Sequence, residues 1–421
     1  MVALQLRTTG QPVGNLLHLP WDRALEEWPD EQFVRLPRGS HRHVVRFLEH
    51  GGRFLALKEL PPELAQREYR LLSFLREEGL PAVELIGVAR DRRAPDGERL
   101  PSVLLTWHLT YSLPYRHLFA TPGQDLHLRL VDALVVLLVR IHLAGFFWGD
   151  CSLSNALFRR DAGALVAYLV DTETGEAHPS GLSDGQRRLD LDLATDNIGG
   201  GLYDLEAAGR LDPSVDPAAV VDLLLERYES LWSELTRADD VGQDELWRID
   251  ERLQRLNQLG FDTAEMELVA SDAGHRIRFR PQVVEEGHHR RELRHLTGIE
   301  AQENQARRLL STMRGYGAWL SQTEGRELPE AVLAYRWLSE RYEPTIAAIP
   351  PELGGRLEDA EIYHQILDHL WFLSERAGHD VGIEAATRDY IATVLRRTPD
   401  ERALLEPADM ATGQIPRIVL P

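Results

Sequence analysis

The chain has 421 residues, and its hydrophobic content of 43% and charged content of 27% are typical of a folded protein with two or three domains. Its net charge of -20 argues against broad binding to nucleic acid or to an anionic membrane. The single cysteine, Cys151, excludes an internal disulfide. No secretory signal or membrane-spanning apolar run is recognisable, so we expect a cytoplasmic protein with no transmembrane segment.

The first hundred residues predict a small sheet with one helix. Residues 1–30 show little pattern and are expected to form an N-terminal extension. A helix is predicted from Pro61-Pro62 to about Glu77, because its leucines recur at helical spacing. The hydrophobic pattern predicts three strands before this helix and two after it. Those strands are expected at residues 33–36, 44–48, 53–60, 82–89 and 102–107.

Lys58 is the only lysine among 47 lysine and arginine residues, and it lies near the end of the apolar strand at 53–60. Arginine is a planar fork, whereas lysine is a compact ammonium on a flexible stem. The exception therefore favours a site that arginine cannot serve, such as the kinase lysine that binds the α- and β-phosphates of ATP. The alternative is a surface lysine that escaped a general bias toward arginine.

The segment from Asp150 to Asn155 carries the strongest chemical signal. It closely follows an apolar helix predicted at 124–143, and its Asp-x-x-x-x-Asn spacing is that of a kinase catalytic loop. In such a loop the aspartate orients or deprotonates the acceptor hydroxyl, and the asparagine holds Mg²⁺. The strand expected at 165–170 leads into Asp171, a carboxylate placed to share that Mg²⁺ with the phosphates. Glu173 is interpreted as a solvated charge, with a further metal ligand as the alternative.

With Lys58, Asp150, Asn155 and Asp171 in this order, residues 30–205 resemble the protein-kinase-like superfamily, most closely the lipopolysaccharide (Kdo/heptose) kinases. The resemblance implies a bilobal α+β fold, with an antiparallel sheet and one helix in the N-lobe and a helical C-lobe. It also implies ATP and Mg²⁺ as substrate and cofactor.

The same resemblance assigns roles outside the catalytic loop. Glu68 would pair with the lysine, with Glu63 as the alternative. Gly39 and Ser40 fall in the turn that would cover the phosphates. Thr106 and His108 fall in the hinge, whose backbone would contact adenine.

Several departures from the protein-kinase sequence pattern narrow the class of kinase that we expect. Trp148 replaces the histidine of His-Arg-Asp, Thr172-Glu173 replaces Phe-Gly, and no Ala-Pro-Glu motif follows. We therefore expect an atypical kinase acting on an unidentified small-molecule or protein hydroxyl. The alternative is a nucleotide-binding pseudokinase that signals through its C-terminal domain.

Two further interpretations concern residues beside the catalytic loop. Asp192 or Asp196 is expected to hydrogen-bond the loop backbone, with solvated carboxylates as an equal alternative. Cys151 is interpreted as a small packed residue rather than a redox centre.

The domain boundaries follow from these patterns. We expect a kinase-like domain at 31–212, with an N-lobe at 31–107 and a C-lobe at 108–212. A mainly helical domain at 213–405, with a β-hairpin near 266–279, and an irregular tail at 406–421 complete the chain.

Two features of the C-terminal half each allow more than one interpretation. A basic cluster from Arg276 to His295 would bind a phosphate-bearing ligand, an acidic partner or the kinase lobe, or be a solvated face. Glu361, His364 and Asp368 share a helix face and would form either a metal site or buried hydrogen bonds. The layout resembles bacterial proteins in which a lipopolysaccharide-kinase-like domain precedes a domain of unknown function, on segments 296–310 and 362–371. That likeness implies no activity for this half.

Overall fold

The computed structural model describes residues 4–9, 14–34, 43–114, 118–119, 126–236, 239–241, 265–270, 277–282, 287–325, 328–398 and 400–401. These residues divide into two compact units. The N-terminal unit comprises the described residues of Met1–Phe158 and Ala167–Glu226, and the C-terminal unit those of Arg159–Val166 and Arg227–Arg402.

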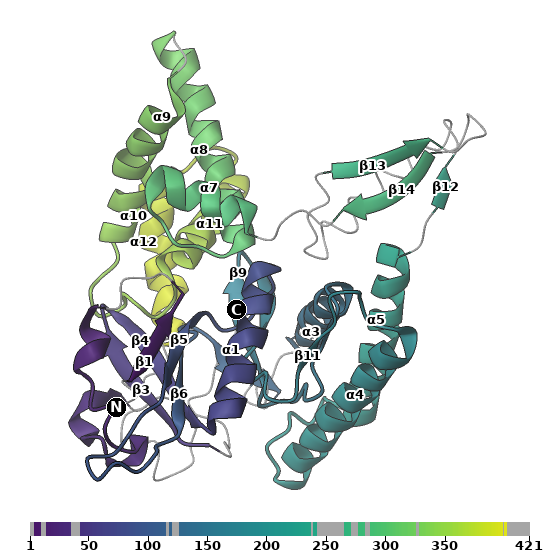
Figure 1. The fold of residues 1–421 in the computed structure, drawn as a ribbon. Coiled ribbons are helices and arrows are strands. Elements are labelled where there is room, and N and C mark those ends of the chain that lie inside the picture. The colour runs from purple at the N-terminus through teal and green to yellow at the C-terminus, as the bar shows by residue number, and fades with distance from the viewer. Residues whose placement is uncertain are drawn as a thin grey trace. The chain divides into compact units, whose positions relative to one another are not determined.

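The N-terminal unit opens with a six-stranded antiparallel sheet in the order β1-β5-β6-β4-β3-β2 (Figure 1). Its five later strands correspond to the five strands expected from the sequence. The first strand was not expected, since it comes from the poorly patterned residues 1–30, where it pairs with β5. The strands are β1 (Gln5–Thr8), β2 (Phe33–Val34), β3 (Val45–His50), β4 (Arg53–Leu60), β5 (Leu85–Arg90) and β6 (Ser102–Trp107).

Side-chain alternation along β4 gives the sheet two different faces. Leu55 and Leu57 are fully buried on one face, in a core that includes Trp21 and Trp28 from the segment before β2. Lys58 lies on the opposite face. The N-terminal segment therefore covers the face that does not carry the lysine.

On the lysine face, the strand register sets an apolar patch beside the ammonium. Val45 of β3 lies opposite Lys58, and Phe47 lies opposite Ala56. Val45, Phe47 and Phe54 form a small buried cluster against which Ala56 packs. The Lys58 ammonium and the apolar surface of Val45, Phe47 and Phe54 thus lie on the same face of the sheet.

Helix α1 (Pro62–Glu77) packs against β5 and β6. It starts with proline at its first position, where the missing N–H has no helical partner to lose. Its apolar residues recur on one face, and Ala65, Leu72 and Leu75 are buried there. Glu68 lies on the same buried side of the helix, at 2% exposure.

The rest of the N-terminal unit is mostly helical, as expected. Helix α3 (Leu126–Leu143) is buried on nearly all sides, and α4 (Asp184–Ala207) begins with the capping residue Ser183. Helix α5 (Pro217–Thr236) follows, and its residues from Arg227 onward belong to the C-terminal unit. Short strands complete this part: β7 (Leu113–Pro114) pairs with β9 (Ala156–Asp161), β9 pairs with β10 (Ala164–Leu169), and β8 (Phe146–Phe147) pairs with β11 (Glu176–Ala177). No helix in the described ranges is long and apolar enough to span a membrane.

The C-terminal unit is mainly helical, with a core that includes Leu309, Met313, Trp337 and Tyr363. Helix α9 continues through a π-helical turn at Leu338–Tyr342 into α10. Strands β13 (Glu265–Ala270) and β14 (Ile277–Gln282) pair antiparallel, which confirms the expected hairpin, and β12 (Asp239–Val241) adds a third strand. The helices are α7 (His288–Thr297), α8 (Glu303–Glu324), α9 (Glu330–Trp337), α10 (Glu343–Ala347), α11 (Asp359–Ala377) and α12 (Ile383–Thr393).

The tip of the β9–β10 hairpin belongs to the C-terminal unit. The buried carboxylate of Asp161 accepts hydrogen bonds from the backbone N–H groups of Asn304 (3.1 Å) and Gln305 (2.8 Å) at the start of α8. Glu361 accepts one from the backbone N–H of Ala162 at 3.1 Å and one from the Gln305 amide at 2.8 Å. The expected boundary at 212 places this whole hairpin in the kinase-like domain, whereas its tip is bound by the C-terminal helices.

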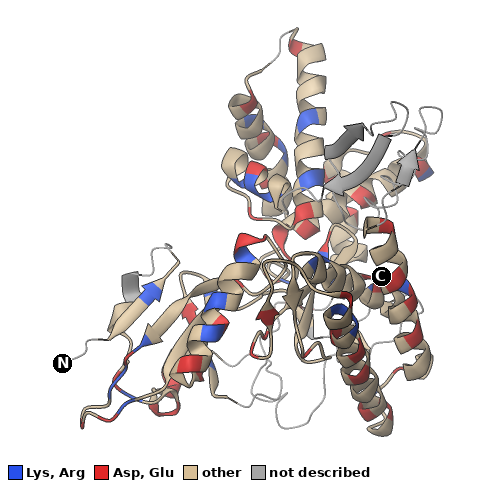
Figure 2. Ribbon diagram, turned by 45° about the vertical axis from the view of Figure 1, so that its right-hand side comes forward, with Lys and Arg blue, Asp and Glu red and all other residues tan. Residues whose placement is uncertain are grey.

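Charged residues of both signs are spread over the described helices and strands. Figure 2 shows acidic and basic positions interspersed along the ribbon rather than gathered by sign.

Candidate functional site

Lys58 lies at the centre of an acidic cluster in the N-terminal unit. Its Nζ atom is 2.9 Å from Glu68 Oε1 and 2.9 Å from Asp171 Oδ2. Glu173 Oε2 lies 3.9 Å from the same nitrogen. Strand β4, helix α1 and the segment after β10 each contribute to this contact. Glu68, rather than the exposed Glu63, is therefore the partner of the lysine.

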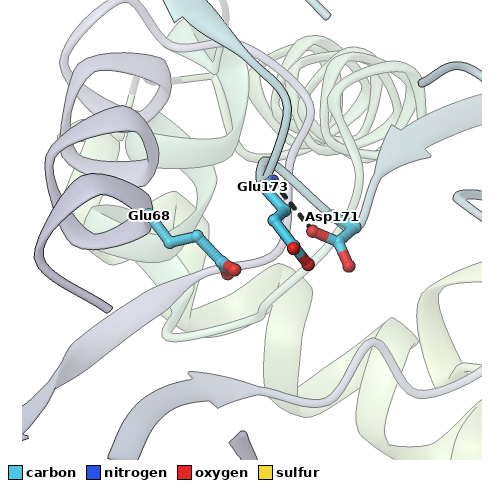
Figure 3. A group of neighbouring side chains, drawn as sticks. All are labelled: Glu68, Asp171 and Glu173. Carbon is cyan, nitrogen blue, oxygen red and sulfur yellow. Dashed lines mark hydrogen bonds between the residues drawn. The ribbon is translucent and has the colours of Figure 1, made fainter. Parts of the chain in front are cut away.

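Three carboxylates converge at this point, as Figure 3 shows. Oxygen atoms of Glu68, Asp171 and Glu173 lie within 4.8 Å of one another, and no other acidic or histidine group in the described residues is as closely gathered. The backbone N–H of Glu173 donates to Asp171 Oδ1 at 2.9 Å, which fixes the turn. Glu173 is half-buried within this cluster, which favours the alternative of a further metal ligand over a fully solvated charge.

The donor set of this cluster fits a hard divalent cation. Three carboxylates face one ammonium, which leaves excess negative charge and unused oxygen lone pairs. Mg²⁺ is bound by one or two carboxylates together with phosphate oxygens and water. The residues present are thus chemically suited to Mg²⁺.

The cluster shifts the acidity of its buried members. Burial raises the pKa of Glu68 to about 7, because desolvation and the neighbouring Asp171 charge outweigh the effect of Lys58. Burial acts in the opposite sense on Lys58, but the charges of Glu68 and Asp171 prevail and raise the pKa of the ammonium. Lys58 is therefore a fixed positive charge, while Glu68 can take up a proton near neutral pH.

Asp150 and Asn155 are adjacent in the catalytic-loop segment. The Asn155 side-chain amide donates to Asp150 Oδ2 at 2.9 Å and to the Asp150 carbonyl at 3.0 Å. The amide nitrogen makes both contacts, so neither engages the Asn155 oxygen. Asn197 of α4 donates to Asp150 Oδ1 at 3.3 Å. The carboxylate of Asp150 is thus oriented from two sides. No local sequence pattern pointed to Asn197 as one of these partners.

Asp190, at the start of α4, anchors the backbone before Asp150. Its carboxylate is fully buried and accepts the N–H groups of Trp148 and Gly149, each at 2.7 Å. His142 of α3 lies 3.0 Å from the same carboxylate. The expectation of Asp192 or Asp196 in this role was wrong, since both are exposed on α4.

Two residues beside Asp150 have structural explanations. Trp148, in the place of the kinase histidine, is fully buried and donates its indole N–H to the Asp171 carbonyl at 3.0 Å. It thereby links the loop to the segment that carries the acidic cluster. Burial raises the pKa of the Cys151 thiol well above its usual value, which agrees with a packed rather than a reactive cysteine.

The structure describes two of the four residues expected to contact the nucleotide. Gly39 and Ser40 lie outside the described residues. Thr106 is in β6, between its pairing partners Ala56 and Leu85. The backbone N–H of His108 donates to the Phe54 carbonyl at 2.7 Å, so this amide is already used within the protein.

Most candidate groups of the C-terminal unit make protein contacts, although Nδ1 of His364 is buried without a hydrogen-bond partner in the described residues. Glu361 accepts hydrogen bonds from Ala162, Gln305 and Gln365, and His364 lies 3.1 Å from Asp368. These contacts favour buried hydrogen bonding over a metal site. In the basic cluster, His289 pairs with Glu303 and Arg294 with Glu300. Arg276 lies outside the described residues.

Comparison with known proteins finds one family match in each half of the chain. Residues 37–191 match the model of the lipopolysaccharide kinase (Kdo/WaaP) family. This segment is a lipopolysaccharide-kinase-like phosphotransferase domain. Residues 230–395 match a domain of unknown function, DUF4032. The two matches confirm the family resemblance inferred for each half.

The chain was also compared with solved structures and with curated proteins. Among solved structures, WaaP in complex with acyl carrier protein is similar over 54% of this chain and 89% of that chain, with 18% sequence identity and a TM-score of 0.34. A comparison with curated proteins found no significant match.

Proposed function

We propose that the lipopolysaccharide-kinase-like domain transfers the terminal phosphoryl group of ATP to a hydroxyl group of its acceptor, with Mg²⁺ as cofactor. The observation that carries this proposal is the contact of Lys58 with both Glu68 and Asp171 at 2.9 Å. A lysine held by a helix glutamate, next to a metal-binding aspartate, is the arrangement that phosphoryl transfer by kinases requires.

Each residue of the cluster has a role in this reaction. Lys58 binds the α- and β-phosphates of ATP, and Glu68 holds the ammonium in place. Asp171 and Asn155 would hold Mg²⁺, with Glu173 close enough to add a ligand. When bound, Mg²⁺ would supply positive charge that offsets the charge of the phosphates. The apolar surface of Val45 and Ala56 on the same sheet face suits the adenine base.

Asp150 acts on the acceptor. Its carboxylate, oriented by Asn155 and Asn197, takes the proton of the acceptor hydroxyl as the new oxygen–phosphorus bond forms. The bond between the γ-phosphorus and the bridging oxygen breaks, and ADP leaves with that oxygen. The protein contributes positioning and fixed charges rather than a covalent intermediate.

We propose that the hinge backbone recognises adenine without the amide of His108. Because the His108 amide is used by Phe54, adenine recognition falls to the other backbone groups after Thr106. Gly39 and Ser40 are proposed to cover the phosphates, as their place in the sequence before β3 implies.

Asp150→Asn separates a phosphotransferase from a nucleotide-binding scaffold. We expect this variant to bind Mg²⁺–ATP like the wild type but to lose phosphoryl transfer or γ-phosphate release, by roughly two to four orders of magnitude. Binding is measured by calorimetry and transfer by phosphate release over a panel of hydroxyl acceptors. Equal residual turnover in Asp150→Asn and the wild type would assign the domain to the scaffold alternative.

A further inference from the structure

A cavity in the N-terminal unit lies among arginines and shares no residue with the Lys58 cluster. It has a volume of about 480 Å³ and is bordered by the start of α1, the end of β5 and the loop that leads to β6. Four of its lining residues are arginines that form no ion pair with a carboxylate among the described residues: Arg70, Arg90, Arg93 and Arg99.

Neutral groups hold three of these guanidinium groups in place. Arg90 donates to the Gln66 side-chain oxygen at 2.6 Å and to the Gln5 side-chain oxygen at 3.2 Å. Arg93 donates to the Gly97 carbonyl at 2.9 Å, and Arg70 to the Gln66 carbonyl at 3.3 Å. These contacts orient the arginines without cancelling their charge, which is the preorganisation that an anion site needs.

The acidic residues at the cavity do not neutralise these arginines. Glu63 and Asp91 also line it, yet neither forms an ion pair with the four arginines in the part of the chain that the structure describes. Arg92 behaves differently, because it is buried and bound to Glu59 at 2.7 Å. Four positive charges thus gather at one cavity of a chain whose net charge is -20.

Two buried polar atoms at this cavity also lack a hydrogen-bond partner within the described structure. They are the hydroxyl of Ser102, a residue only 1% exposed, and Nε of Arg90. Buried polar groups without a partner are rare in folded proteins and indicate a missing acceptor or donor. A bound anion with several oxygens would supply acceptors for both.

We propose that this cavity binds a small anion that carries phosphate groups. The guanidinium fork matches phosphate oxygens with paired hydrogen bonds, and several arginines suit a ligand with more than one negative charge. The proposal does not depend on the phosphotransferase activity, since Lys58, Asp150, Asn155 and Asp171 lie outside the cavity.

Inorganic pyrophosphate in the presence of EDTA is the probe that tests this site. Without a divalent cation the acidic Lys58 cluster repels pyrophosphate, whereas the arginine cavity does not. Calorimetry on the full chain is expected to show saturable binding by the wild type. Arg70→Gln and Arg99→Gln should each weaken it about tenfold or more, because each removes a charged hydrogen-bond donor.

Matched variants keep the test independent of folding and of the proposed function. Arg76→Gln changes another arginine of α1 that does not line the cavity, and Lys58→Ala disables the nucleotide cluster; both should bind pyrophosphate like the wild type. Ser102→Ala should weaken binding while the ligand-free protein stays folded. Lack of binding by the wild type, unchanged binding by Arg70→Gln and Arg99→Gln, or equally tight binding of citrate would overturn the phosphate site.

Discussion

Each unit contains a pair of buried or half-buried carboxylates, and the two pairs have different neighbours. In the N-terminal unit, Glu68 and Asp171 share one ammonium, that of Lys58. In the C-terminal unit, Asp161 and Glu361 are surrounded by N–H donors of the backbone and of amide side chains. Glu68, Asp161 and Glu361 are buried and Asp171 is half-buried, so the main difference lies in what compensates their charge.

The contrast distinguishes the proposed binding site around Lys58 from the structural hydrogen bonds around Asp161. Amide donors satisfy the lone pairs of Asp161 at fixed positions and leave few oxygen sites for a ligand. The Lys58 cluster keeps three carboxylates for one cation, so it gains from a divalent ion and from phosphates that the lysine can share. Burial alone therefore does not indicate function, whereas excess charge at close range does.

Replacing Lys58 should produce the largest effect on activity. Lys58→Ala leaves the three carboxylates without their cation, and we expect phosphoryl transfer to fall by roughly two to three orders of magnitude. Lys58→Arg keeps the charge but not the compact ammonium, so it should still lose about tenfold or more. Steady-state transfer rates measure both, and a fully active Lys58→Arg would show that any positive charge suffices.

Replacing Asp161 should act on stability. Asp161→Ala removes the acceptor of three N–H donors at the start of α8, and we expect a loss of about 2–4 kcal/mol in the free energy of unfolding. Denaturant titration followed by hydrogen exchange of α8 measures this loss. The exposed Asp184→Asn serves as the control, and a wild-type midpoint for Asp161→Ala would contradict the structural role.

The acidity of Glu68 predicts a smaller effect that depends on pH. Its pKa rises from 4.5 to about 7 on folding, so the folded state binds more protons between these values. The stability that Glu68 contributes is therefore present below pH 4.5 and is lost as the pH rises through 7. Above 7 the carboxylate is ionised and holds Lys58 most strongly.

Nucleotide binding should follow the same ionisation. The affinity for Mg²⁺–ATP is expected to increase by up to about tenfold per pH unit until the pH passes 7. Glu68→Gln should remove this dependence, because its amide does not titrate. A slope that persists unchanged in Glu68→Gln would assign it to another group.

Local patterns predicted much of the N-terminal unit. The apolar run that ends near Lys58 and the leucine spacing of α1 identified β4 and the helix beside it. The family resemblance then favoured Glu68 over Glu63, and the structure places Glu68 on the buried face of that helix. The order of Asp150, Asn155 and Asp171 suggested the rest of the candidate site.

The parts that sequence reasoning missed depend on contacts between distant segments. Asp190 rather than Asp192 reaches the loop because the rotation of α4 buries it, and the low amphipathicity of that helix does not reveal which side faces inward. The bond from Gln305 to Asp161 joins residues 144 positions apart. No local sequence spacing indicates such a contact, so the hydrogen bonds between the tip of the β9–β10 hairpin and the start of α8 could not be predicted.

The central claim is that the Lys58 cluster holds Mg²⁺ and ATP together. Calorimetry of ATP binding with and without Mg²⁺, on the wild type and on Asp171→Ala, tests it most directly. We expect the wild type to bind ATP tightly only with Mg²⁺, and Asp171→Ala to lose this Mg²⁺-dependent gain. ATP affinity that is the same with and without Mg²⁺, or is unchanged in Asp171→Ala, would contradict the assignment of this cluster.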